Sequence, residues 1–324
     1  MKVRFVDFGQ QYEDHKREYD HAIQRCLTMG RLVLQDELEN FEKNLAEFLG
    51  MKYAVGVASG TDALKIALRC KDLDTFVTTS GYTFKATHEA IWENGARPEM
   101  VDVDENRLAH DVNVPVHIEG MVAPSEHAIV EDACQAIGAE GIGYSGTACY
   151  SFYPAKILGG LGDGGAIVTN DKKLADKARL LRHHWQTDEN EEMGYCSRLD
   201  NINAAFLNVK LQHLPDILQR RKEIAMRYKT LSGVVDLPFY QEGRVWQDYV
   251  IETDDSEELA MWLTSNGIQT LGQGMTPPHI AQKTGKKLMM TDKLYKRMLR
   301  LPCNETLSDA QVDFVIEKVK EYYG

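Results

Sequence analysis

The sequence predicts an α/β protein with a mostly parallel sheet, and three observations lead to that prediction. From about residue 53 to 170, short Val/Ile-rich runs alternate with turns and helical patterns, which is typical of a parallel sheet with crossover helices. Residues 12–50 have helical periodicity, and strand and helix patterns start again after about residue 235. We therefore expect a large domain over residues 1–235 and a small C-terminal α/β domain over residues 236–324.

Periodicity and capping signals place the later elements of the chain. The expected helices span residues 171–184, 215–231 and 256–266, and the expected strands span residues 246–252 and 268–271. Ser308 with Gln311 three residues later forms a capping box, so a final helix is expected to begin there.

The composition favours a soluble enzyme and argues against several other classes of protein. The chain has 324 residues and a formal net charge of −12, which disfavours binding to nucleic acid or to an anionic membrane. No run approaches the roughly eighteen apolar residues of a membrane-spanning helix, and the amino terminus lacks the apolar segment of a signal peptide. We therefore expect a cytoplasmic protein.

The cysteines and histidines indicate neither a disulfide framework nor a metal site. The six cysteines are scattered along the chain, and no two stand in a Cys-x-x-Cys pair. His183 and His184 are adjacent, but a polar cluster at the end of a helix explains the pair more simply than a metal does. We expect reduced thiols and no bound metal.

One lysine, Lys156, stands between an apolar strand-like run and a glycine-rich loop. A lone lysine after a strand is usually an ordinary surface residue. An ammonium held in a tight, partly desolvated pocket loses proton affinity, however, and the neutral amine forms a Schiff base with an aldehyde. The neighbouring motifs decide between these two interpretations.

A second motif places the beginning of a helix after a short β-prone run. Ser59 is followed three residues later by Asp62, which is a capping arrangement before an apolar helical pattern. The free backbone N–H groups of Gly60 and Thr61, with the helix dipole, form a binding site for a phosphate group. Most helices begin with such a cap and bind nothing, so this motif alone is weak.

A third motif ends a buried strand in two carboxylates, Glu131 and Asp132. In open α/β sheets ligands bind at the C-terminal ends of the strands, which is where we expect Asp132. A carboxylate there holds a pyridine nitrogen protonated, and the protonated ring makes pyridoxal phosphate an electron sink. The three motifs thus suit an aldehyde, a phosphate and a ring nitrogen.

Together these motifs resemble those of the DegT/DnrJ/EryC1/StrS family of sugar aminotransferases, which depend on pyridoxal phosphate. The similarity covers nearly the whole chain. It includes further blocks at residues 5–12, 81–87, 101–104, 197–200 and 301–302. So many blocks in one order make the match specific. The resemblance implies the three-layer fold of type I pyridoxal-phosphate enzymes, and a homodimer with active sites at the subunit interface.

The same resemblance implies roles for individual residues. The catalytic residues are Lys156, which binds the cofactor aldehyde, and Asp132, which pairs with the pyridinium nitrogen. Gln135 contacts the ring hydroxyl, and Phe84 stacks on the ring face, although a place in the core is an alternative for this aromatic side chain. The residues implied to bind the cofactor are Gly60, Thr61, Phe84, Asp132, Gln135, Ser151 and Lys156.

The resemblance also implies the reaction. We expect a nucleotide-linked 3- or 4-keto sugar to be converted to an amino sugar, with glutamate as the amino donor and pyridoxamine phosphate as the intermediate. Three alternatives stay open: a sugar dehydratase of the same family, in which histidine replaces the lysine, a non-catalytic regulatory protein, and an NAD-dependent oxidoreductase. Residues 160–165 match the Gly-x-Gly-x-x-Gly pattern of dinucleotide binders, but they precede a strand-like run and not a helix.

The chain departs from the family pattern in two short intervals and at two single positions. Residues 105–114 and 118–128 are too short for the helices that the family normally has there. One face of the sheet should therefore be covered thinly, by loop side chains or by another subunit. Ile157 and Cys196 stand at positions that are commonly Asn. The second of these asparagines usually reaches the cofactor phosphate of the neighbouring subunit, so that contact is expected to differ.

Overall fold

The computed structural model describes residues 1–186, 193–272 and 287–324, and it confirms the α/β class. The strands of the larger part are β1 Tyr53–Val57, β2 Phe76–Ser80, β3 Arg97–Val101, β4 Glu131–Asp132, β5 Thr147–Ser151 and β6 Gly165–Thr169. Four of them form a sheet in the order β1–β6–β5–β4, and β2 pairs with β3. Single bridges from Val114 to Thr79 and from Val116 to Asp132 connect the two groups. Only β6 runs against its neighbours, so the sheet is mostly parallel.

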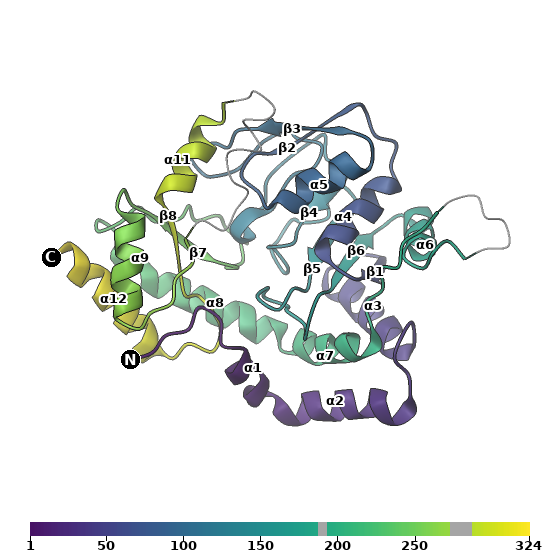
Figure 1. The fold of residues 1–324 in the computed structure, drawn as a ribbon, viewed down its shortest axis with the longest axis horizontal. Coiled ribbons are helices and arrows are strands. Elements are labelled where there is room, and N and C mark those ends of the chain that lie inside the picture. The colour runs from purple at the N-terminus through teal and green to yellow at the C-terminus, as the bar shows by residue number, and fades with distance from the viewer. Residues whose placement is uncertain (187–192, 273–286) are drawn as a thin grey trace.

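Helices cover both faces of this sheet, which gives the expected three layers (Figure 1). The helices of this part are α1 Phe8–Asp14, α2 Lys16–Met29, α3 Asp36–Phe48, α4 Gly60–Arg69, α5 Lys85–Glu93, α6 Lys172–Leu181, α7 Asn201–Gln212 and α8 Leu214–Tyr228. In β6, Val168 packs in the same core as α3 and α7, whereas Ile167 packs in the core of α4, α5 and α6. This alternation is the period of two that a strand imposes.

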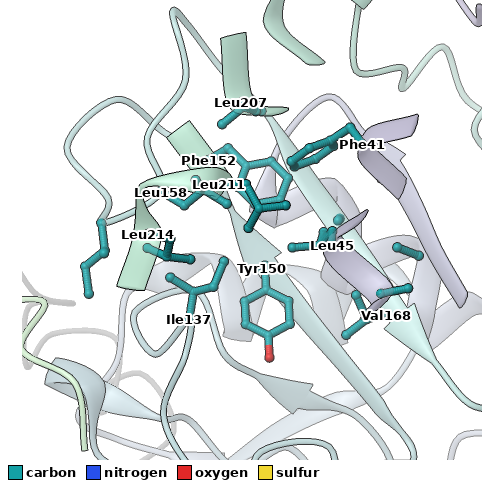
Figure 2. Packing of buried hydrophobic residues seen from close by; sticks show 14 of the residues in the cluster. Phe41, Leu45, Ile137, Tyr150, Phe152, Leu158, Val168, Leu207, Leu211 and Leu214 are labelled. Carbon is teal, nitrogen blue, oxygen red and sulfur yellow. The ribbon is translucent and has the colours of Figure 1, made fainter. Parts of the chain in front are cut away.

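The core between α3, α7 and the sheet is dense and largely aromatic and aliphatic. Figure 2 shows Phe41 of α3 and Leu207 of α7 close to Phe152, with Tyr150 of β5 below them. The rings of Phe41 and Phe152 meet edge to face, with centroids 5.2 Å apart. Helix α7 was not expected from the sequence, because it is buried between α2 and α3 and has no polar stripe.

The second part of the chain packs a two-stranded sheet against helices at one end of the molecule (Figure 1). Its elements are β7 Tyr249–Glu252, α9 Ser256–Ser265, α11 Met289–Arg297, β8 Met298–Leu301 and α12 Asp309–Tyr323. Its core includes Tyr249 and Leu299, and also Tyr228 of α8 and Val3. The domain boundary near residue 235 stays a prediction.

Two predictions of strands in this part are wrong: one strand is shorter than expected, and the other is not formed. The strand expected from residue 246 begins only at Tyr249. The strand expected at residues 268–271 is not formed, because Ile268 bridges Val3 whereas Leu271 bridges Arg300, so the segment changes partner after one residue pair. The capping box at Ser308 is confirmed.

The shortened region between β3 and β4 has no α-helix, as expected. The only helical element of residues 102–130 is a 3-10 turn, Ile118–Gly120. Apolar side chains of this region, among them Leu108 and Met121, pack directly against Val250 of β7 and Leu294 of α11. Loop side chains and the second part of the chain therefore cover the sheet here. No helix among the described residues is long and apolar enough to cross a bilayer.

Candidate active site

The C-terminal ends of β1, β4 and β5 open into a cavity of about 540 Å³. These strands run in the same direction, so their ends share one edge of the sheet. All the residues that the sequence implied for the cofactor line this cavity, and they are Gly60, Thr61, Phe84, Asp132, Gln135, Ser151 and Lys156.

Helix α4 presents its free N-terminus to one end of the cavity. Ser59 Oγ accepts a hydrogen bond from the backbone N–H of Asp62 at 3.1 Å, so the expected cap is formed. The N–H groups of Gly60 and Thr61 have no acceptor within the helix, and no other described residue accepts from them. This end of the cavity therefore suits an anion such as phosphate.

Gly60 allows α4 to approach the end of β5 closely. A Cβ at this position would lie 2.7 Å from Ser151 Cβ and 2.9 Å from Cys134 Sγ. Since real Cβ atoms do not approach other atoms so closely, any larger residue would push the helix end away from Ser151. The phosphate position thus depends on a glycine at residue 60.

The resemblance implies that residues 194–198 contact a neighbouring subunit. Part of this segment instead makes hydrogen bonds within this chain. Ser197 is buried, its Oγ donates to Asp62 Oδ2 at 2.6 Å, and it accepts from the N–H of Ala58 at 3.1 Å. Cys196 is exposed, and its sulfur lies 3.1 Å from Nη2 of Arg198. Ser197 therefore fixes the turn between β1 and α4, whereas Cys196 beside it is exposed.

The carboxylate of Asp132 lies at the end of β4 and is only 6% exposed. Its Oδ2 accepts from the hydroxyl of Thr87 at 2.7 Å, and its Oδ1 accepts from the N–H of Cys134 at 3.2 Å. The hydroxyl of Thr83 is 2.9 Å from that of Thr87. Because Thr87 uses its proton toward Asp132, Thr83 donates to Thr87. This chain of hydroxyls fixes the orientation of the carboxylate.

The amide of Gln135 has one orientation. Its Oε1 accepts from the backbone N–H of Glu119 at 2.9 Å. A backbone N–H can only donate, so the amide oxygen must face Glu119 and the Nε2 group is left for the cavity. The side chain is therefore a hydrogen-bond donor toward any oxygen on a bound ring.

Phe84 lies on the cavity wall and is 50% exposed, so the core alternative for this residue is wrong. It is the N-cap residue of α5, which places its ring beside the carboxylate-bearing end of the sheet. A half-exposed ring at a cavity wall suits stacking against a planar ligand.

Lys156 follows β5 in a tight turn, in which its N–H donates to the carbonyl of Tyr153 at 2.8 Å. The turn needs Gly159, because a Cβ there would lie 2.1 Å from the carbonyl oxygen of Pro154. Within residues 1–186, 193–272 and 287–324, the ammonium of Lys156 has no hydrogen bond or ion pair. No described side chain therefore holds its nitrogen, which as the neutral amine can react with an aldehyde in the cavity.

Several cavity residues come from the second part of the chain and were missed by the sequence reasoning. They are Gln247, Asp248, Leu271 and Arg300. Burial works to lower the pKa of Arg300, but Asp248, whose Oδ2 is 3.2 Å from Nε, together with Tyr82 and Glu119 outweighs it, and the pKa is raised. No local motif marks these positions, since they meet the lysine only through the fold.

The glycine-rich stretch does not form a dinucleotide-binding turn. Residues 160–165 lead directly into β6, whereas a dinucleotide-binding turn opens a helix. Asn203 of α7 holds the stretch, with Oδ1 accepting from the N–H of Leu161 at 2.9 Å and Nδ2 donating to the carbonyl of Asp163 at 3.0 Å. The expectation that the order of elements is wrong for a Rossmann turn is confirmed.

Outside the cavity, the described residues bring His15, Glu18 and His213 together. The two imidazole rings stack with centroids 3.7 Å apart and planes 19° from parallel. The lone pairs of their nitrogens lie in the ring planes, so they do not converge on one point. This cluster joins α2 to the junction of α7 and α8.

The chain is similar to curated proteins along its whole length. It is 34% identical to the dTDP-3-amino-3,4,6-trideoxy-alpha-D-glucose transaminase of Streptomyces venezuelae, over 99% of this chain and 96% of that protein. It is also 34% identical to a pleiotropic regulatory protein of Geobacillus stearothermophilus, over 100% of this chain and 99% of that protein. The second comparison spans 370 positions, whereas this chain has 324 residues, so this chain has no residue at some of the aligned positions.

Solved structures agree in fold over nearly all of the chain. DesV of S. venezuelae, in complex with a ketimine intermediate, has a TM-score of 0.92 at 33% identity and covers 99% of this chain and 98% of its own. NtdA of Bacillus subtilis, with bound cofactor PMP, has a TM-score of 0.87 at 26% identity and covers 99% of this chain and 85% of its own. The DegT/DnrJ/EryC1/StrS aminotransferase family matches residues 13–131 and 117–320. The protein described here belongs to that family.

Proposed function

We propose that this protein is a pyridoxal-phosphate-dependent aminotransferase that converts a nucleotide-linked keto sugar to an amino sugar. One observation carries the proposal: Lys156, whose side chain has no ion pair with any described residue, shares a cavity with three groups that suit the three parts of one cofactor. They are the free N-terminus of α4 for the phosphate, the Asp132 carboxylate for the ring nitrogen, and the Gln135 Nε2 group for the ring hydroxyl.

When bound, pyridoxal phosphate supplies an electron-withdrawing ring that stabilises negative charge at the α-carbon of the amino donor. Asp132 holds the proton on the ring nitrogen. The amine of Lys156 would hold the cofactor. Once the donor has taken its place, that amine would move a proton between the donor's α-carbon and the C4′ position of the cofactor. In the second half-reaction, in which the sugar would gain the amine, Lys156 would move the proton in the opposite sense.

We further propose glutamate as the amino donor and a sugar with the keto group at C3. The transaminase of S. venezuelae is named for a sugar that carries its amino group at C3, which supports that position over C4. Glutamate leaves as 2-oxoglutarate, so one amino group and one oxo group exchange and the overall reaction needs no oxidant.

We propose that two copies of the chain form the working enzyme in the cytoplasm. Tyr153, Phe84 and Leu271 at the cavity wall are 55%, 50% and 48% exposed, which is apolar surface that a second subunit would cover. Cys196 faces outward and is the group of its segment that is available to a partner's cofactor. All six cysteines are free thiols, which supports a reducing compartment.

The regulatory and dehydratase alternatives are weaker. The similarity to a regulatory protein concerns a name, whereas the intact cavity around Lys156 favours catalysis. The presence of lysine where dehydratases of the family have histidine disfavours the dehydratase reaction.

The test is to incubate the purified protein with glutamate, pyridoxal phosphate and a panel of dTDP- and UDP-linked 3-keto and 4-keto sugars. Mass spectrometry should detect one amino sugar, and 2-oxoglutarate should form in equal amount. Lys156→Ala should form neither. If the wild type attaches the cofactor but aminates no sugar in the panel, the proposed substrate class is wrong. That result would favour the alternative of a regulatory protein.

A further inference from the structure

The side chain of Gln247 holds the turn that carries Lys156 on both sides of the lysine. Its Oε1 accepts from the N–H of Ile157 at 3.1 Å, and its Nε2 donates to the carbonyl of Ala155 at 3.1 Å. Gln247 lies 90 residues after Ile157, just before β7, and is only 8% exposed. It also lines the cavity.

The two hydrogen bonds permit only one orientation of the amide. The N–H of Ile157 can only donate and the carbonyl of Ala155 can only accept. If the amide rotated by half a turn, two donors would face each other on one side and two acceptors on the other. The contact with Ile157 is buried and the contact with Ala155 is partly buried, so water would replace the lost hydrogen bonds only in part.

The backbone at Gln247 is held in place by a buried ion pair. Nη1 of Arg221 donates to the carbonyls of Trp246 and Gln247, at 3.3 and 3.2 Å. Arg221 also binds Glu305 Oε2, through Nε at 2.9 Å and Nη2 at 2.8 Å. The guanidinium is 3% exposed, so this fork cannot move without breaking a buried charge pair. The amide of Gln247 therefore meets the lysine turn from a rigid support.

We propose that Gln247 is a positioning residue that sets the direction in which the Lys156 amine enters the cavity. The proposal rests on the proposed function, because it assumes that Lys156 is the residue that binds the cofactor. Without the two contacts, residues 155–157 lose their support from the second part of the chain, and the amine samples directions in which it does not reach the bound aldehyde. A misplacement of about 1 Å at a reacting group slows reaction by roughly a hundredfold.

The chain offers a matched control in Gln241. Its Oε1 accepts from the N–H of Val122 at 2.6 Å and its Nε2 donates to the carbonyl of Val122 at 2.9 Å. Gln241 thus makes the same kind of two-point contact with backbone, but it does not line the cavity. Gln241→Met and Gln247→Met remove equivalent hydrogen bonds, and only the second acts on the lysine turn.

The experiment measures how fast pyridoxal phosphate attaches to the apo protein, by absorbance, with borohydride reduction and peptide mapping to identify the lysine. We expect Gln247→Met to attach the cofactor at Lys156 about ten- to a hundredfold more slowly than the wild type. Gln241→Met should stay within about twofold of the wild-type rate, even if both variants unfold at lower denaturant concentration. Equal rates in Gln247→Met and the wild type would overturn the proposal.

Two further readouts keep the outcomes distinct. If the wild type does not attach the cofactor at Lys156, the proposed function fails and the positioning role fails with it. If Gln247→Met does not fold, hydrogen exchange of the wild-type apo protein decides the question. Slow exchange at the Ile157 amide supports the contact with Gln247, and exchange as fast as in an unprotected loop overturns it.

Discussion

Among the polar contacts that stabilise residues 102–130, those of Glu119 should contribute most to the free energy of unfolding. The residue is fully buried at a φ of 55°, in the turn that replaces a helix. Its Oε1 accepts from the hydroxyl of Tyr82 at 2.6 Å, and its Oε2 accepts from Nη1 of Arg107 at 2.9 Å. Its backbone N–H also orients Gln135, so the same turn supports the fold and the site.

Replacing Glu119 by Ala removes the carboxylate that accepts from the buried Tyr82 hydroxyl and from Nη1 of Arg107, although Nη1 keeps the carbonyl of Val250 at 3.2 Å. Breaking a buried ion pair by removing one partner costs about 3–5 kcal/mol. Arg107 keeps Oε1 of Glu252 at 2.7 Å, so we expect the lower end of that range, about 3 kcal/mol. Burial and the Glu119 carboxylate both raise the pKa of Tyr82, which keeps the phenol protonated and in need of an acceptor. Because domains are typically stable by only about 5–15 kcal/mol, the loss should be easy to measure.

Denaturant unfolding of the apo protein, followed by circular dichroism, provides the assay. Glu119→Gln is the control, since its amide oxygen can still accept from Arg107 and the Tyr82 hydroxyl keeps Met298 Sδ at 3.7 Å, so it should lose less stability than the alanine variant. A Glu119→Ala protein within about 1 kcal/mol of the wild type would show that these contacts do not hold the shortened region, and the reasoning would be refuted.

Three further predictions concern the site and its support. Asp132→Asn should lower the rate of amino transfer by about a hundredfold or more, because the proton on the ring nitrogen is no longer held; a near-normal rate would mean that another acid serves. Gly60→Ala should weaken cofactor binding, measured by absorbance titration, since its Cβ would lie 2.7 Å from Ser151 Cβ; unchanged affinity would contradict the phosphate position. Burial lowers the pKa of Lys210 to about 8 from 10.5, so the unfolded chain binds more protons between these values and stability should rise with pH there, by up to roughly 3 kcal/mol. Lys210→Met should lack this part of the rise, and parallel stability curves for the two proteins would contradict it.

The sequence predicted those parts of the site that local motifs define. Ser59 marks its helix because a hydroxyl before an apolar helical pattern caps it, and the structure has that hydrogen bond. Lys156 and Asp132 stand at strand ends, so the rule for ligands in α/β sheets places both at one edge. Gln247 could not be predicted, because its contacts with Ala155 and Ile157 depend on how β7 and its preceding turn pack against the larger sheet.

The fold, too, could be predicted where a local pattern defines an element and not where packing does. Helices with one apolar face, such as α3, have a clear period in the sequence. Helix α7 has none, since Leu207 packs in the core of α3, Phe206 packs against α2 on another face, and both are buried. The expected strand at residues 268–271 failed because apolar residues there pair with Val3 and Arg300 in turn, which the local pattern does not encode.

The central claim is that Lys156 forms the covalent link to pyridoxal phosphate, and one measurement tests it directly. The purified protein is loaded with pyridoxal phosphate, reduced with borohydride and digested, and the peptides are mapped by mass spectrometry. We predict that the cofactor is fixed on the peptide that contains Lys156 and that fragmentation assigns it to that side chain. Labelling of another lysine in place of Lys156, or no labelling of a protein that has bound the cofactor, would contradict the account.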